Sequence, residues 1–356
     1  MRKASRNWLP THGTNAKSSG TSAVGGAGYW IVYGAITIAV LFVNVLTEPD
    51  RYADFDSYIY YLDTLVHFPP PSWLYFEVLS NFFLLGMHWI ARSVLSGVEL
   101  AHYALGVFFV LMLPAVYRPR STPWPGLLLS FAMLGPLLAF VTIRATPAYF
   151  LVAIAVRLAL KRRPAAWACL AVASFFHISA LVAAAPLAVV YFERHLPALL
   201  RSDRSRQYYL IVMLGIVALG AALPQLSDSV IGLIRLFPVL SKYEVYTDPN
   251  SAVTQIGHYI YLAFVSLLTF MFMVVRNQAS ARLSMYVLMS FTLYVVMFFT
   301  AAPVAAFRQT PFWIIPMIAV LPWERFGVRH VTVPFFVLAC VALMVLQFSQ
   351  VYDRGV

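Results

Sequence analysis

Long apolar runs follow one another along nearly the whole chain and leave little room for any fold other than a bundle of membrane-spanning helices. Hydrophobic residues make up 61% of the 356 positions, and charged residues only 11%. A helix of about 20 apolar residues spans the roughly 30 Å hydrocarbon core of a bilayer. Apolar runs occupy residues 29–47, 74–95, 98–117, 124–143, 146–160, 165–192, 207–224, 256–275, 283–302, 308–322 and 331–351. Because the alternating pattern of transmembrane strands is absent, we predict an all-α polytopic transmembrane helix bundle with about 9–11 hydrophobic segments.

The positively charged residues gather in short connections between these runs. The net charge is +11, and the basic clusters lie at Arg118 and Arg120, 161–163, 194–206, Arg276 and Arg282, and Arg325 and Arg329. Basic loops beside transmembrane helices face the cytoplasm, so this distribution sets the orientation of the chain. It does not form the separate basic surface of a nucleic-acid-binding domain. We expect a multi-pass protein of the inner (plasma) membrane with a cytoplasmic N-terminus and no nucleic-acid partner.

The first 28 residues differ in composition from the rest of the chain. They are rich in Gly, Ser and Thr, and they contain too little apolar surface to fold, so residues 1–28 are predicted to form a disordered basic cytoplasmic tail. Residues 29–352 then form a single transmembrane domain. Its two long polar connections, 48–73 and 225–255, are expected on the external side.

The run at 74–95 is predicted not to cross the membrane fully. An odd number of crossings must separate the external segment 48–73 from the cytoplasmic pair Arg118 and Arg120, yet two apolar runs lie between them. On a helical projection, four polar residues of this run fall within about 60° of one another. These residues are Glu77, Asn81, His88 and Arg92. Such a stripe is typical of an interfacial or cavity-lining helix.

The run at 165–192 is predicted to enter the membrane and return to the same side. The basic clusters at 161–163 and 194–206 flank it, and both are expected in the cytoplasm. The run is long for one crossing, and Pro186 introduces a kink. Non-helical backbone at membrane depth is tolerated where it is buried in protein or lines a cavity, which a re-entrant segment of this kind would satisfy.

In this topology the few ionisable residues that interrupt or border the apolar runs all approach the external side. They are Glu77, Arg144, His177 and Arg308. A charge at the centre of a bilayer costs about 2.5–3.5 kcal/mol on insertion scales, so such residues usually face a bundle interior or a water-filled cavity. A guanidinium group presents a planar fork that matches phosphate oxygens. Anchoring arginines belong on the cytoplasmic side, which favours anion binding by Arg144 and Arg308 over anchoring.

Glu77 and His177 each allow two interpretations. Glu77 follows three prolines and begins an apolar helix, where the helix dipole stabilises a carboxylate. In a low-dielectric pocket the same carboxylate suits base catalysis. His177 is either a satisfied core histidine or a neutral imidazole that activates an acceptor hydroxyl or binds phosphate. The sequence alone leaves these alternatives open.

Residues 54–63 combine carboxylates with aromatic rings. At helical spacing Asp54, Tyr58 and Tyr61 share one face, and Asp56 lies on the neighbouring face. Aromatic faces beside carboxylates suit sugar binding, through CH–π stacking and hydrogen bonds to hydroxyl groups. An interfacial tyrosine belt is the alternative interpretation.

The sequence does not predict a metal or cofactor site. His177 has no second His or Cys at ligand spacing, and Cys169 and Cys340 lie in separate apolar runs, where free thiols are expected. A Walker motif, a dinucleotide-binding glycine fingerprint and a Gly-x-Ser-x-Gly elbow are all missing from the sequence. We expect no cofactor, and energy-coupled transport and serine hydrolysis are disfavoured.

The order and spacing of the short motifs form a recognisable pattern over most of residues 50–320. The motifs are Asp54-Phe55-Asp56-Ser57-Tyr58-Ile59-Tyr60-Tyr61, Glu77, Ile143-Arg144 with Ala148, Lys161-Arg162-Arg163, Phe176-His177-Ile178-Ser179-Ala180-Leu181, and Arg308 before Phe312-Trp313. This pattern resembles the EpsG family of Wzy-like polysaccharide polymerases. The chain departs from the family after Arg144, where Ala-Thr-Pro replaces Gln and a small-residue pair, and after Glu77, where Val-Leu replaces Pro or Gly and an aromatic residue. The second departure bears on whether Glu77 is equivalent to the glutamate of the family's motif.

The resemblance implies a membrane glycosyltransferase that joins polyprenyl-pyrophosphate-linked repeat units into exopolysaccharide or O-antigen on the external face, without a metal. In that function Arg144 and Arg308 bind pyrophosphate, and His177 or Glu77 accepts the acceptor proton. The sugar-binding residues are Asp54, Asp56, Tyr58 and Tyr61. Expected partners are the lipid-linked glycan, membrane lipid, a chain-length regulator and other polysaccharide-assembly proteins. The alternatives are a flippase or transporter of the same glycan, a transferase that decorates the polymer, and a non-catalytic assembly subunit.

Overall fold

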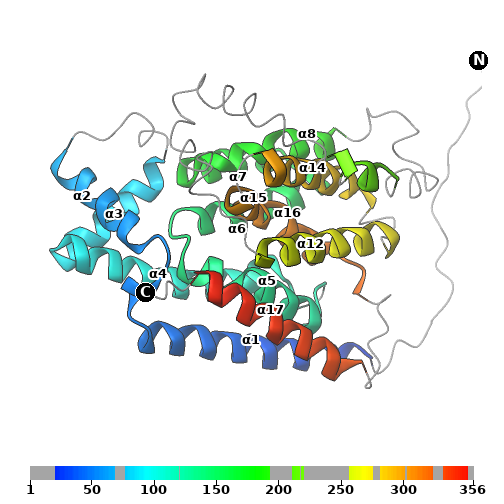
Figure 1. Ribbon diagram of the computed structural model, residues 1–356, viewed down its shortest axis with the longest axis horizontal. Coiled ribbons are helices and arrows are strands. Elements are labelled where there is room, and N and C mark those ends of the chain that lie inside the picture. The colour runs from blue at the N-terminus through cyan, green and yellow to red at the C-terminus, as the bar shows by residue number, and fades with distance from the viewer. Residues whose placement is uncertain are drawn as a thin grey trace, which may run out of the picture.

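Helices account for the regular structure of the described residues. The computed structural model describes residues 21–68, 77–119, 121–192, 211–216, 218–219, 256–275, 281–300, 303–323 and 332–351, and these contain helices and no strands. Figure 1 shows the long helices lying side by side, with α2 (Phe55–His67) and α3 (Val78–Ala91) gathered at one end of the bundle. The prediction of an all-α bundle is confirmed.

Three described helices are long and apolar enough to cross a membrane. They are α1 (Thr21–Leu46), α4 (Val94–Val116) and α12 (Ile256–Val275). The other elements are η1 (Pro49–Arg51), α5 (Trp124–Phe140), α6 (Ala145–Leu160), α7 (Ala165–Phe176), η3 (Ile178–Ala183), α8 (Ala184–Tyr191), α14 (Ser284–Thr300), α15 (Pro303–Gln309), α16 (Pro311–Val320) and α17 (Val333–Val351). Among these, α5, α6, α7, α14 and α16 are apolar helices of 10–17 residues.

Several expected segments lie wholly or partly beyond the described residues. Helix α1 begins at Thr21, within the stretch 1–28 that we expected to be a tail, and residues 1–20 are outside the described part. The expected external connection 225–255 also lies outside it. Of the apolar run 207–224, residues 211–216 and 218–219 are described, and they are helical.

Helix α3 packs beside the N-terminal half of α4 and does not extend along the whole bundle. Its 14 residues span about 21 Å, which is less than the hydrocarbon thickness. Gly97 of α4 permits the close packing, since a Cβ there would lie 3.0 Å from the backbone of His88. The α2 side chains Phe55 and Leu62 join this pair in an apolar cluster separate from the main core. That 74–95 does not cross the membrane fully stays a prediction.

Residues 165–192 fold back on themselves. Helix α7 ends at Phe176, His177 adopts an extended conformation with φ −153° and ψ 120°, and η3 and α8 follow. Trp167, near the start of the segment, packs edge-to-face on Tyr191, near its end, with ring centroids 5.8 Å apart. The segment therefore returns to the level at which it began, as the flanking basic clusters predicted, and His177 lies at its far end.

Candidate active site

A cavity of about 540 Å³ lies where α2, the α5–α6 turn, the 165–192 segment, α14 and α15 meet. Seven of the eight residues singled out from the sequence line it: Asp54, Asp56, Tyr58, Tyr61, Arg144, His177 and Arg308. The eighth, Glu77, is fully buried against three of the seven, Tyr61, Arg144 and His177. Segments more than 250 positions apart in the chain thus converge on one site.

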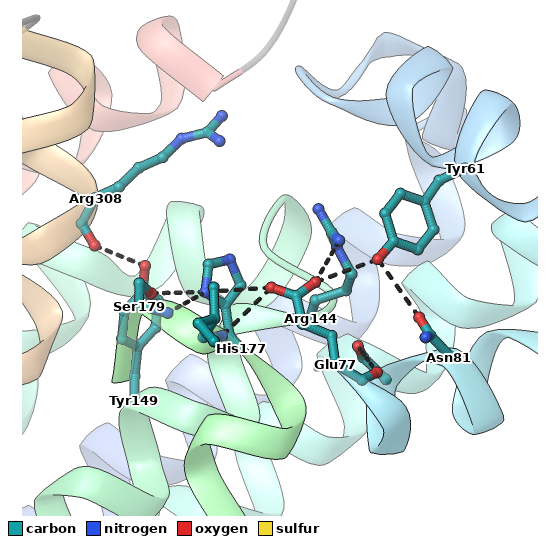
Figure 2. A network of polar contacts seen from close by, with 10 residues as sticks. Tyr61, Glu77, Asn81, Arg144, Tyr149, His177, Ser179 and Arg308 are labelled. Carbon is teal, nitrogen blue, oxygen red and sulfur yellow. Dashed lines mark hydrogen bonds and ion pairs between the residues drawn. The ribbon is translucent and has the colours of Figure 1, made fainter. Parts of the chain in front are cut away.

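Glu77 is the centre of the polar network in Figure 2. Its Oε2 accepts hydrogen bonds from Arg144 Nη1 at 2.6 Å and from the Tyr61 hydroxyl at 3.2 Å. Its Oε1 accepts one from the backbone N–H of Ile178 at 3.3 Å. A buried carboxylate is stable only when it is paired and hydrogen-bonded, and donors from three separate segments meet this requirement. Glu77 therefore connects α2, the α5–α6 turn and the 165–192 segment.

The turn between α5 and α6 presents Arg144. The hydroxyl of Thr142 donates to the carbonyl of Leu137 at 3.1 Å, and that of Thr146 donates to the carbonyl of Leu138 at 2.9 Å. The Leu137 carbonyl also accepts the backbone N–H groups of Val141 and Thr142, so the two threonine hydroxyls add side-chain donors to the last turn of α5. The turn is thereby held against α5, and Arg144 occupies the position just before α6.

Two tyrosines of α2 enclose the guanidinium of Arg144. Its Cζ lies 4.0 Å from the ring centroid of Tyr61 and 5.6 Å from that of Tyr58, within the range of cation–π contacts. Burial raises the pKa of both phenols above the ordinary tyrosine value, with the Arg144 charge acting in the opposite direction. Both rings therefore stay neutral, and Glu77 supplies the charge that balances Arg144. Holding the arginine is a role that we had not predicted for these tyrosines.

The hydrogen bonds of His177 set the position of its ring proton. The backbone N–H of Ser179 donates to Nδ1 at 3.2 Å, and the Ser179 hydroxyl lies 2.6 Å from the same nitrogen (Figure 2). Because a backbone N–H can only donate, Nδ1 is the acceptor and the neutral ring carries its proton on Nε2. His177 lines the cavity and so offers it an N–H donor.

Arg308 and Asp54 form a second ion pair at the cavity. Arg308 Nη2 lies 2.8 and 2.7 Å from the two carboxylate oxygens of Asp54, and the side chains are 29% and 24% exposed. This pair is more accessible than Glu77, which is fully buried. Asp54 has φ 75°, a left-handed conformation that aspartate tolerates better than most residues. The Tyr149 hydroxyl donates to the Arg308 carbonyl at 2.7 Å and fixes its backbone.

Four further residues belong to the site that sequence reasoning did not single out. They are Asn81, Tyr149, Ser179 and Gln309. Asn81 shares the polar stripe of Glu77, and Ser179 lies in the motif around His177, so both had a signal. Gln309 directly follows Arg308 and is 92% buried, and its Oε1 has no hydrogen-bond partner among the described residues. Tyr149 carried no signal, because an aromatic residue on an apolar helix is ordinary.

The described residues contain no group of three or more His, Cys, Asp or Glu side chains that could hold a metal ion.

A family model described as the EpsG family matches residues 30–356. The chain belongs to the EpsG family. The match covers all eight residues predicted for the site, and membership makes the chain a membrane protein of polysaccharide biosynthesis. No curated protein and no solved structure matches it.

Proposed function

We propose that this EpsG-family protein polymerises polyprenyl-pyrophosphate-linked oligosaccharide repeat units into exopolysaccharide or O-antigen by glycosyl transfer on the external membrane face. The observation that carries the proposal is the convergence of Arg144 and Arg308, from opposite halves of the chain, on one cavity lined with carboxylates and phenols. The two arginines can bind the negatively charged pyrophosphate, and the tyrosines and carboxylates that line the cavity can bind sugar rings. The cavity is also within the usual size range for a small-molecule site.

The arginines stabilise the leaving group. When the bond between the anomeric carbon and the pyrophosphate oxygen breaks, the electron pair stays with the pyrophosphate. Fixed cations stabilise that charge most where water is excluded. Arg308, with 29% of its side chain exposed, contacts the pyrophosphate directly. Arg144 is more enclosed and stabilises the pyrophosphate charge electrostatically without direct contact. His177 donates from Nε2 to a phosphate oxygen.

The proton of the acceptor hydroxyl goes to a carboxylate. Our expectation of Glu77 or His177 as the base is revised, because Glu77 is buried in an ion pair and His177 Nδ1 already accepts from Ser179. Of the carboxylates that line the cavity, Asp54 is bound to Arg308. We assign the proton to Asp56. The acceptor oxygen then bonds to the anomeric carbon as the polyprenyl pyrophosphate departs.

Gene deletion with mass spectrometry of lipid-linked glycans and surface polymer tests this function. A polymerase deletion leaves single repeat units on the polyprenyl pyrophosphate in the outer leaflet and no polymer. Units trapped on the cytoplasmic leaflet would indicate a flippase instead. Full-length polymer that lacks one substituent would indicate a decorating transferase.

The assignment of Asp56 has a matched control on the same helix. Asp56→Asn should lower turnover by about 10²–10⁴-fold, the usual contribution of a general base. Asp63→Asn should leave turnover near wild type, because Asp63 pairs with His67 at 3.0 Å and does not line the cavity. Polymer formed per amount of purified protein is the measurement. Equal turnover in the two variants would remove Asp56 from the mechanism.

A further inference from the structure

A second cavity, of about 710 Å³, lies between α1, α4, α6 and α16 at the opposite end of α6 from Arg144. Arg144 lies just before α6 and Lys161 just after it, and the 16 residues of α6 span about 24 Å. The second cavity lies at the end where the basic connection 161–163 leaves α6. It is therefore distinct from the candidate active site.

The rim of this cavity is cationic. Arg118 follows α4, Arg157 lies in the last turn of α6, and Lys161 directly follows α6. Arg118 is close enough to Arg157 for the two positive charges to oppose one another. None of the three forms an ion pair with an acidic side chain in the part of the chain that the structure describes. In the candidate active site, by contrast, Arg144 and Arg308 each have a carboxylate partner.

The walls of the same cavity are apolar. Val156 and Pro316 are buried on its inner side, and Trp30 is 53% exposed at its edge. A tryptophan at this position is typical of the level of lipid headgroups. A site with a cationic rim, apolar walls and an interfacial tryptophan matches a ligand with an anionic head and a hydrocarbon tail. Basic pockets between transmembrane helices bind lipid headgroups in the same way.

One of the three cations, Arg157, is held in place by a hydrogen bond to the end of α4. Pro114 interrupts the hydrogen bonding near the end of α4. Arg157 Nη1 donates to the carbonyl of Ala115 at 2.7 Å, and the Tyr33 hydroxyl donates to that of Val110 at 3.2 Å. The bond to Ala115 holds Arg157 near Arg118, although the two positive charges repel one another. A bound anion would offset that repulsion.

We propose that this second cavity binds the phosphate headgroup of a membrane lipid, with Arg118, Arg157 and Lys161 as its ligands and the acyl or prenyl chain against the apolar walls. The lipid is a bilayer phospholipid such as phosphatidylglycerol, or a polyprenyl pyrophosphate; both present the same phosphate chemistry. Lipid binding at this cavity does not depend on the polymerase function, because none of its lining residues lines the candidate active site.

Native mass spectrometry of the delipidated full-length protein, titrated with phosphatidylglycerol, measures the binding. Arg118→Gln and Lys161→Gln should each raise the dissociation constant about fivefold, and the double variant should raise it further than either single variant. Both side chains are exposed, so the variants should fold, which monodisperse elution checks. Arg163→Gln removes an exposed charge two positions beyond Lys161 that does not line the cavity, and it should leave binding unchanged.

Two further titrations separate the lipid sources and test the charge requirement. Tighter binding of phosphatidylglycerol than of polyprenyl pyrophosphate, sensitive to both substitutions, assigns the site to a resident phospholipid. The reverse order, equally sensitive, assigns it to a polyprenyl carrier. Equal binding by wild type and the double variant overturns the proposal, as does equal affinity for phosphatidylglycerol and phosphatidylcholine.

Discussion

The buried ion pair of Glu77 and Arg144 should contribute to the stability of the protein, and breaking it should be destabilising. Glu77→Gln leaves the Arg144 charge uncompensated, so the free energy of unfolding should fall by about 3–5 kcal/mol. Adding Arg144→Gln removes the stranded charge. The double variant should therefore lose less stability than the sum of the two single variants. Thermal unfolding in detergent gives all four values.

An exposed ion pair provides the control for this double-mutant cycle of Glu77 and Arg144. Glu48 and Arg51 lie 3.8 Å apart with side chains 76% and 50% exposed. Glu48→Gln should change stability by about 0.5 kcal/mol or less, since solvent screens such pairs. If Glu77→Gln were as mild as Glu48→Gln, or if the two site substitutions were simply additive, Glu77 would not be the group that balances Arg144.

The two nitrogens of His177 can be separated by substitution. Asparagine keeps an acceptor near Nδ1 for the Ser179 N–H but has nothing at Nε2. His177→Asn should therefore fold normally and lose about 10²-fold in turnover. His177→Gln places an amide N–H near the Nε2 position and should recover part of that loss. Turnover and membrane abundance are measured for both. Loss of abundance in His177→Asn would instead indicate a purely structural histidine.

At the scale of elements, the 165–192 segment makes a prediction about sidedness. Because Trp167 packs on Tyr191, residues on either side of this hairpin should lie on the same membrane face. In a background with Cys169 and Cys340 replaced by alanine, Arg163→Cys and Phe192→Cys should react with an impermeant maleimide from the same side. Arg51→Cys, beside the candidate active site, should react from the other. Labelling of positions 163 and 192 from opposite faces would refute the hairpin.

This hairpin also shows how far sequence reasoning reaches. Basic clusters on both sides of one apolar run predicted that it returns, because charge asymmetry constrains the side of each connection. The same reasoning predicted that Arg144 and Arg308 approach the same side, and both line one cavity. Partners could not be predicted. Arg144 pairs with a residue 67 positions away and Arg308 with one 254 positions away, and sequence spacing does not determine how distant helices pack.

The roles of individual side chains were equally hidden in the sequence. Helical spacing placed Tyr58 and Tyr61 on one face, but whether that face meets a sugar or a guanidinium depends on the helix opposite. Glu77 was open between a helix-terminal carboxylate and a base. Its contact with Ile178 comes from the hairpin tip, which has no local signal near residue 77. Such roles depend on how the helices pack in three dimensions. Composition indicates only that ionisable residues in apolar runs face away from lipid.

At the scale of the whole molecule, the two ends of α6 should be functionally separable. Sites more than about 10 Å apart without shared partners usually respond independently to substitution. Arg308→Lys keeps the charge but loses the planar fork, so polymer formation should fall by about 10²-fold while phosphatidylglycerol still binds the second cavity with wild-type affinity. Arg51→Lys, an exposed arginine at the same end of the molecule as Arg308, should alter neither property. Normal polymer formation by Arg308→Lys would rule out the proposed contact between Arg308 and the pyrophosphate. Loss of lipid binding in that variant would mean that the two ends of the bundle form one coupled unit.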